Sequence, residues 1–383
     1  MFTIVEKTVQ LDFPLGHHLH CMISQLPNHI RFDDEVQPEQ ITDDKWQQIK
    51  SVLDLVATGP GNLKKLHFLL FPESTLPVAH IDDALAMIQE RFCANTVVML
   101  GMEHIPLHAF AALSERFAAD NQEMIDAIAR DRNSGDIENL RVNFAAIVIK
   151  EADGQTRVFL QAKSHPFAGE ESLGNRDLYH GKVFPLFRSK PTGFNFMAMI
   201  CFDYIYRTIY QSNISTVIQH ANELFFSTRQ HLDFLAILEC NPKPEHATFR
   251  DVVNGFYGEY LAAAPGVRET ITVFCNSAEA TRDSLPMVTP NDTFGHSSVI
   301  IHKNHKMAPR KLRDFTVDTF AGLPVCRLRF GPQSRLYYFN LPVFHEFDPR
   351  STRMPLKVHS IFEPTPSGGW QRMPLSPEAT SNE

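Results

Sequence analysis

The sequence predicts an α/β protein built on mixed β-sheets. Apolar runs typical of buried strands alternate with stretches of helical spacing along most of the chain, and pairs of runs joined by turns indicate hairpins among them. The 383 residues are 43% hydrophobic and 21% charged, which is the composition of an ordinary globular protein. No internal repeat and no Gly- or Ser-rich linker divides the chain. We therefore expect one domain over residues 1–347, followed by a Pro-rich, extended and partly ordered tail at 348–383.

The expected strands and helices follow one another through this domain. The runs that indicate buried strands are HCMISQL at 20–26, LHFLLF at 66–71, TVVMLGM at 96–102, NFAAIVIK at 143–150, TRVFLQAK at 156–163, FNFMAMI at 194–200, LDFLAIL at 232–238, TITVFC at 270–275 and SSVIIH at 297–302. Helical spacing is found at 43–59, 81–92, 215–230 and 249–264. The turn EADG predicts a hairpin over 143–163, and LRFGPQSRLYYFNL at 328–341 is interpreted as a second hairpin.

Charge and cysteine usage argue against several classes of function. The net charge of −8 and the pI near 6.1 disfavour binding of nucleic acid through its phosphates. The six cysteines are widely spaced, without a C-x-x-C pair or a zinc-type pattern, so we expect free thiols and neither a metal nor another cofactor. The histidines of GHHLHC at 16–21 are expected to form a surface or strand-edge cluster. The N-terminus does not resemble a signal peptide and no apolar run is long enough to span a membrane, so we expect a cytoplasmic protein.

Three strand ends carry polar groups that form a coherent chemical set. Glu73, Lys163 and Cys201 each stand at or just after the end of an apolar run. Reactive groups in α/β sheets gather at the carboxyl ends of the strands. A carboxylate can accept the proton of a thiol, the thiolate can attack a carbonyl or nitrile carbon, and an ammonium group can stabilise the charge that develops.

The order and wording of these three motifs resemble the nitrilase, or carbon–nitrogen hydrolase, superfamily. They read FPE at 71–73, KSH at 163–165 and ICFD at 200–203. The resemblance extends from about residue 18 to about residue 345, and FCNSA at 274–278 is similar to the late strands in which the family often has an Asn and a Ser. The resemblance implies a four-layer α-β-β-α sandwich with two mixed sheets.

The resemblance also implies roles for the site residues. Glu73 would be the general base, Lys163 the oxyanion stabiliser and Cys201 the nucleophile, with the backbone N–H of Phe202 as a second oxyanion donor. Many members have another glutamate on the loop after the lysine. Glu171 matches the usual spacing better, and its neighbour Glu170 is the alternative.

The expected activity is hydrolysis of a non-peptide C–N bond through a Cys thioester. Amides are the leading substrates, with nitriles and N-carbamoyl compounds as alternatives, and transfer of the acyl group to an amine is a weaker third reading. The family implies a homodimer or a larger homo-oligomer, and the unusual segments 102–140 and 204–231 are candidates for contact with a protein partner. The rival interpretation is a nitrilase-fold interaction module in a larger complex, similar to those that accompany a reverse transcriptase in bacterial antiphage defence.

Overall fold

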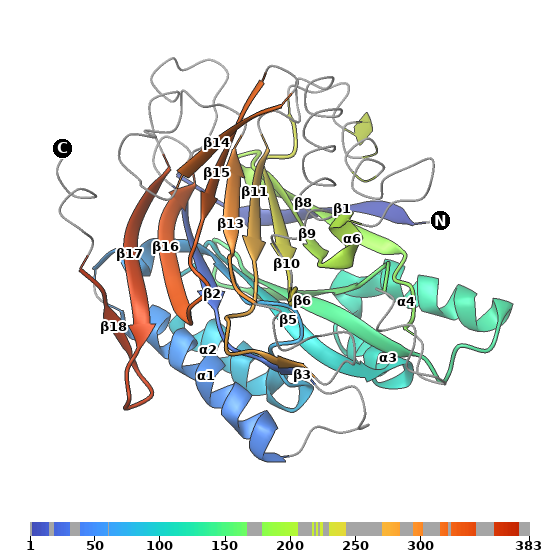
Figure 1. Ribbon diagram of the computed structural model, residues 1–383. Coiled ribbons are helices and arrows are strands. Elements are labelled where there is room, and N and C mark those ends of the chain that lie inside the picture. The colour runs from blue at the N-terminus through green and yellow to red at the C-terminus, as the bar shows by residue number, and fades with distance from the viewer. Residues whose placement is uncertain are drawn as a thin grey trace.

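Two large mixed β-sheets dominate the protein, as the computed structural model shows (Figure 1). The structure describes residues 2–14, 19–30, 39–59, 61–166, 178–205, 217, 220, 223–224, 230–242, 270–283, 294–301, 315–320, 323–341 and 356–374. Within these ranges the predicted α/β class with mixed sheets is confirmed, and all nine expected buried strands are present. A separate two-stranded ribbon pairs β3 (His29–Ile30) with β12 (Arg282–Asp283).

The first large sheet, called sheet B, has the order β18-β17-β16-β2-β4-β5-β6-β7. Its strands are β2 (Leu19–Gln25), β4 (Leu66–Leu70), β5 (Thr96–Pro106), β6 (Arg141–Lys150), β7 (Thr156–Ala162), β16 (Arg335–Leu341), β17 (Lys357–Pro364) and β18 (Trp370–Arg372). The central strands β2, β4 and β5 are parallel. The predicted β6–β7 hairpin is confirmed, and its strands pair antiparallel at the edge of the sheet.

The second large sheet, called sheet A, has the order β1-β8-β9-β10-β11-β13-β15-β14. Its strands are β1 (Thr3–Leu11), β8 (Val183–Pro191), β9 (Asn195–Ile200), β10 (Phe234–Leu238), β11 (Ile271–Cys275), β13 (Ser298–Ile301), β14 (Phe315–Phe320) and β15 (Leu323–Arg329). Here β9, β10 and β11 form the parallel centre.

The two sheets pack face to face through an apolar layer. Phe68 of β4 contacts Phe196 of β9 and Phe234 of β10, with ring centroids 5.3 and 4.7 Å apart. Strand residues of both sheets belong to this one buried cluster, because alternate side chains of each strand point to the same face. The core therefore joins the sheets into a sandwich.

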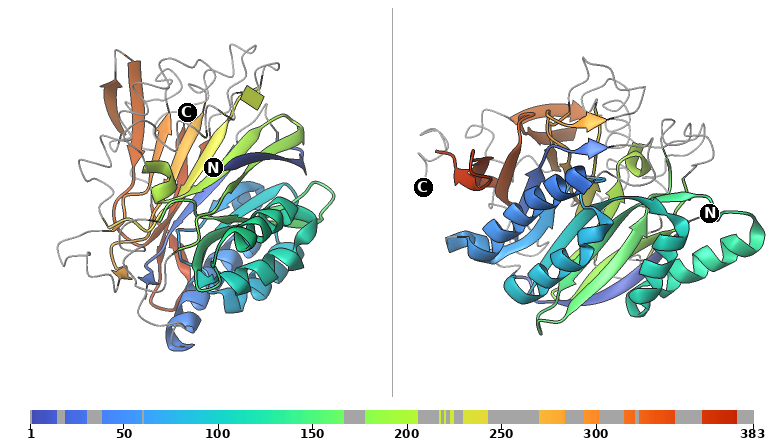
Figure 2. Two further views of the ribbon diagram at one scale, coloured as in Figure 1. Left: turned by 90° about the vertical axis from the view of Figure 1, so that its right-hand side faces the viewer. Right: turned by 90° about the horizontal axis from the view of Figure 1, so that it is seen from below.

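Four longer helices cover the outer face of sheet B (Figure 2). They are α1 (Glu39–Thr58), α2 (Ile81–Arg91), α3 (Leu107–Arg116) and α4 (Ala118–Ser134), with short 3-10 turns η1 (Gly61–Lys65) and η2 (Val78–His80). Each buries an apolar stripe at helical spacing, as in Ile49, Val52, Leu53 and Val56 of α1. The helices α3 and α4 form a pair within the segment 102–140, and this pair packs on the sheet through contacts such as Phe110 with Phe144. None of the helices in the described ranges combines the length and apolarity that a membrane crossing requires.

Both faces of the central strands of sheet A are buried. Every residue of β9 and β10 is inaccessible, including Met199 and Ile237, which lie outside the cluster between the sheets. On this outer side the structure describes α6 (Phe202–Ile205). Most of the expected helix at 215–230 and the whole of that at 249–264 lie outside the described residues.

The prediction of a hairpin at 328–341 is wrong, because the two strands of this segment belong to different sheets. β15 pairs with β13 and β14 in sheet A, and β16 pairs with β2 and β17 in sheet B. The side-chain amide of Gln25 donates to the carbonyls of both Gly331 and Gln333 at 2.7 Å and so holds the crossing segment. Local alternation predicts a strand but not its partner, which the packing of the two sheets decides.

The C-terminal segment adds strands to sheet B. Within 348–383, the described part forms β17 and β18, which pair antiparallel with each other and continue from β16. Val358, Ser360 and Phe362 alternate into the protein, and the indole of Trp370 donates to the hydroxyl of Ser51 on α1 at 2.9 Å. This part of the expected tail is therefore an ordered sheet edge. Alternate residues of β17 are buried, and strand pairing stabilises this arrangement despite the nearby prolines.

Candidate active site

Strand direction brings the ends of β4 and β7 to one edge of sheet B. β4 is parallel to β5, while β6 is antiparallel to both β5 and β7, so β4 and β7 point the same way. Glu73 lies in the turn that follows β4, and Lys163 directly follows β7. Residues 90 positions apart in sequence thereby meet.

Glu73 and Lys163 form a buried ion pair. Lys163 Nζ lies 2.9 Å from Glu73 Oε1, and the side chains are only 2% and 6% exposed. Removing two charges from water costs free energy, which is recovered only when the geometry is good and additional hydrogen bonds satisfy the groups. The fold must therefore supply further hydrogen-bond partners to this ion pair.

Two further donors hold the Glu73 carboxylate. Asn143 Nδ2 donates to Oε1 at 2.6 Å, and the backbone N–H of Cys240 donates to Oε2 at 3.1 Å. Asn143 is also fixed by the chain, because its carbonyl accepts from the backbone N–H of Lys163 at 2.8 Å. Both carboxylate oxygens therefore have directed donors, which sets the orientation of the group.

The backbone around Glu73 is equally constrained. Asn28 Nδ2 donates to the carbonyls of Glu73 and Ser74 at 3.1 and 3.0 Å, and Ser74 adopts a left-handed φ of 58°. A Cβ on Gly101 would lie 1.9 Å from the Pro72 carbonyl oxygen. Only glycine lets β5 approach this turn so closely.

Cys201 stands at a sharp turn between β9 and α6. Its φ of 40° is in the left-handed region, which is strained for a residue with a side chain. Its N–H donates to Leu238 O at 2.8 Å and its carbonyl accepts from Tyr204 N at 3.1 Å. Cys201 is partly exposed, and it packs against the apolar cluster between the two sheets. Phe202 follows as the first residue of α6 and is also partly exposed.

Described contacts connect the Cys201 turn with both members of the ion pair. Asp203 Oδ1 accepts from the backbone N–H groups of Ser164 and His165 at 2.9 and 2.8 Å, directly after Lys163. On the other side, Leu238 binds the Cys201 N–H, and Cys240, two residues later, binds Glu73. The three strand ends selected from the sequence thus belong to one connected region.

The titratable groups beside Lys163 have shifted pKa values. Burial raises the pKa of Asp203 to about 7, against the opposing influence of Lys163 and of the hydrogen bonds from Ser164 and His165. Burial, followed by His180 and Lys163, lowers the pKa of His165 to about 4, so this imidazole is neutral at pH 7. His165 therefore adds no positive charge to that of Lys163.

A second group of polar residues borders Glu73 from the loop after β11 and from α1. Ser277 Oγ donates to Cys240 Sγ at 3.2 Å, and Asn276 Oδ1 accepts from Asn241 N at 2.9 Å, so the Asn–Ser pair noted in the sequence anchors this loop. Lys45 is 5% exposed and donates to Ser74 O at 3.2 Å. Burial lowers its pKa to about 8, although Glu103 and Cys240 act in the opposite direction.

Sequence reasoning missed Asn143 and Cys240 as site residues. The sequence held a signal for Asn143, because it is a polar residue in an otherwise apolar run. In the structure this residue is 1% exposed. Cys240 acts through its backbone, for which side-chain type gives no signal. Glu170 and Glu171 lie in 167–177, outside the described residues. Among the described residues, no group of three or more His, Cys, Asp or Glu side chains could hold a metal.

Comparison with known proteins leaves the family open. No protein-family model matches this chain, and no curated protein matches it. The resemblance to the carbon–nitrogen hydrolases therefore depends on the three short sequence motifs.

Proposed function

We propose that the protein hydrolyses a non-peptide C–N bond through a thioester on Cys201. Amides are the leading substrates, and nitriles and N-carbamoyl compounds are the alternatives. The single observation that carries the proposal is the buried Glu73–Lys163 ion pair, at 2.9 Å, at the strand edge that adjoins the Cys201 turn. A scaffold has no physical need of such a pair, because replacing a buried ion pair with apolar residues is often neutral or stabilising.

The first half of the reaction forms the thioester. Glu73 takes the proton of the Cys201 thiol as sulfur attacks the substrate carbon. Lys163 and the backbone N–H of Phe202 stabilise the negative charge on the substrate oxygen. When the C–N bond breaks, Glu73 returns the proton to the leaving amine.

Hydrolysis of the thioester completes the cycle. Glu73 takes a proton from water as the water oxygen attacks the thioester carbon. The C–S bond then breaks, the acid product leaves, and Glu73 gives its proton to the departing sulfur, which restores the Cys201 thiol and the Glu73 carboxylate. Asn143 and the Cys240 N–H keep the carboxylate oriented through both steps. Glu171, with Glu170 as the alternative, would orient Lys163 from the loop after it.

We also propose the four-layer α-β-β-α arrangement of this family. The helices on sheet B, the two packed sheets and the complete burial of β9 and β10 on both faces support it. A strand that is buried on both faces requires cover beyond the facing sheet.

The test combines activity with thiol chemistry. The purified chain is incubated with a panel of amides, nitriles and N-carbamoyl compounds, and ammonia or amine release is measured. We expect release from at least one class, with activity abolished in Cys201→Ala and iodoacetamide labelling of Cys201 in addition to that of the exposed Cys93. Cys93→Ala is the matched control, because Cys93 is an exposed thiol outside the site and its loss should leave activity intact.

Absence of release from every class, together with a Cys201 that iodoacetamide does not label, would contradict the hydrolase proposal. The interaction-module alternative predicts instead that Cys201→Ala preserves every association of the chain. Turnover by the native chain separates the two, because both predict unchanged oligomeric state and partner capture in this variant.

A further inference from the structure

Three histidines and a tyrosine form an aromatic cluster in sheet B, called the histidine cluster: His20 of β2, His67 of β4, His359 of β17 and Tyr338 of β16. The ring of His20 is stacked on that of His67, with centroids 5.8 Å and planes 10° apart, and on that of Tyr338, at 5.4 Å and 18°. The ring of His359 lies 5.4 Å from that of His20 and 5.6 Å from that of Tyr338. The cluster therefore connects the C-terminal strand β17 with the centre of the sheet.

The surroundings of His67 favour a neutral ring. Its side chain is buried, and its Nδ1 accepts from the backbone N–H of His20 at 3.0 Å. A ring nitrogen that accepts a hydrogen bond carries no proton, so a doubly protonated ring would lose this bond to β2. Burial lowers the pKa of His67 from 6.5 to about 4. Protonation of His67 would thus both break a contact between two strands and place a charge in the cluster.

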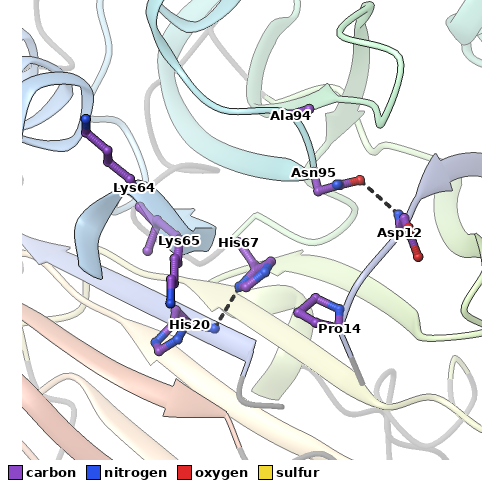
Figure 3. A pocket seen from close by; sticks show the side chains of 9 residues that line it. Asp12, Pro14, His20, Lys64, Lys65, His67, Ala94 and Asn95 are labelled. Atoms are coloured by element: carbon purple, nitrogen blue, oxygen red, sulfur yellow. Dashed lines mark hydrogen bonds between the residues drawn. The ribbon is translucent and has the colours of Figure 1, made fainter. Parts of the chain in front are cut away.

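The charges around the cluster in the described chain are mostly positive. Lys65 extends toward the ring of His20 at a cavity of about 530 Å³ that both residues line (Figure 3). Arg372 donates to the carbonyl of His359 at 3.0 Å, and Tyr338 stays uncharged because burial raises the pKa of its phenol. The charged side chains of the surrounding elements are Asp12, which precedes β2, Lys64 and Lys65 of η1, Lys357 of β17 and Arg372 of β18, while His17 and His18 lie outside the described residues. An imidazolium ring in this cluster would therefore meet an excess of like charge.

The strands β17 and β18 are the part of sheet B that such a charge can displace most easily. β17 pairs with β16 on one side and with only three residues of β18 on the other. The register of β17 on β16 is interrupted between Tyr338 and Phe339, where His359 is the extra residue of the bulge. By contrast, β2 and β4 lie inside the sheet with full strands on both sides. Segments with few pairing partners open at a lower free energy than the centre of a sheet.

We propose that protonation of the histidine cluster in mildly acidic solution releases β17 and β18 from sheet B while the rest of the two-sheet core stays folded. Neighbouring imidazolium rings 5.4 to 5.8 Å apart would repel one another. Because the pKa of His67 in the folded protein lies below its ordinary value of 6.5, the paired arrangement is fully stable above that pH and loses stability as the pH falls toward about 4. The inference concerns the fold and does not depend on the proposed hydrolase function.

Hydrogen exchange of the full chain, followed by mass spectrometry between about pH 7 and about pH 4.5, tests the proposal. The protection factor, which is the ratio of the intrinsic to the observed exchange rate, removes the pH dependence of the exchange chemistry itself. For the amides of β17 and β18 it should fall about tenfold for each pH unit below about 6.5, because opening takes up one proton. The amides of β5, in the interior of sheet B, should keep their protection.

Two variants remove a titrating ring and keep the local contacts. His67→Asn retains an acceptor for the His20 N–H, and His359→Phe retains an aromatic ring on β17. Each should reduce the loss of protection between about pH 6.5 and about pH 4.5 by about tenfold or more. His108→Asn, at an exposed position of α3, is the matched control and should follow the native protein.

Three results would overturn the proposal. One is protection of β17 and β18 that does not change with pH. Another is loss of protection in β5 at the same pH as in β17, which would indicate acid unfolding of the whole protein. The third is a loss of protection in both cluster variants equal to that of the native protein and of His108→Asn, which would place the titrating group outside the cluster.

Discussion

Replacing Lys163 with methionine removes one charge from an almost completely buried ion pair. The side chains of Lys163 and Glu73 are 2% and 6% exposed, so water cannot compensate the carboxylate that remains. Methionine has a similar length and leaves little empty volume, so the measured change reports mainly on charge.

The expected cost follows from the surroundings of Glu73. Breaking a buried pair on one side typically costs about 3–5 kcal/mol. In Lys163→Met the carboxylate retains its hydrogen bonds from Asn143 and the Cys240 N–H, so we expect a loss near the lower end, about 3 kcal/mol. Glu73→Gln keeps an acceptor for these donors but leaves the lysine charge buried, and we expect a loss of similar size.

Urea titrations of the two single variants and the double variant give the coupling between them. The double variant has neither charge, so its loss should be smaller than the sum of the single losses by about 2 kcal/mol or more. The exposed pair Arg116–Asp82, at 49% and 65% side-chain exposure, is the matched control and should couple by less than about 1 kcal/mol. Equal coupling in the buried and exposed pairs would refute the reasoning.

Three further predictions concern the surroundings of the site and the sheet edge. Asp203 has a folded-state pKa raised from 3.8 to about 7, so the folded protein retains a proton that the unfolded chain releases, and the free energy of unfolding should fall as pH rises through this window. Asp203→Asn keeps an acceptor oxygen and removes the titration, so its melting temperature relative to the native protein should rise between about pH 4 and pH 7; a constant difference would contradict this. Gly101→Ala places a Cβ 1.9 Å from Pro72 O and 2.6 Å from Glu73 Cα, so urea titration should show a loss of at least about 2 kcal/mol, and native stability would show that the turn is looser than described. Ending the chain before Leu356 removes β17 and β18 and uncovers an edge of β16, so thermal unfolding should occur at lower temperature with aggregation, whereas unchanged melting of a soluble chain would argue against a structural role for these strands.

The apolar periodicity of the sequence was sufficient to locate the buried strands. Runs such as those at 66–71 and 194–200 are apolar on both faces because both sides of their sheets are covered, and this property is encoded within each run itself. The placement of Glu73, Lys163 and Cys201 at strand ends was likewise readable, since it depends only on where an apolar run stops.

Tertiary structure decided which of these segments are neighbours. The strands around Gly331 look like a hairpin locally but enter different sheets, and the C-terminal strands pair with β16, because partner choice depends on packing between segments far apart in sequence. The same holds for the hydrogen bonds of Asn143 and the Cys240 N–H to Glu73, which span 70 and 167 positions. The sequence determined the chemical groups and the strands that carry them, and only the folded sandwich determined their partners, because hydrogen bonding and burial are set by distance in space.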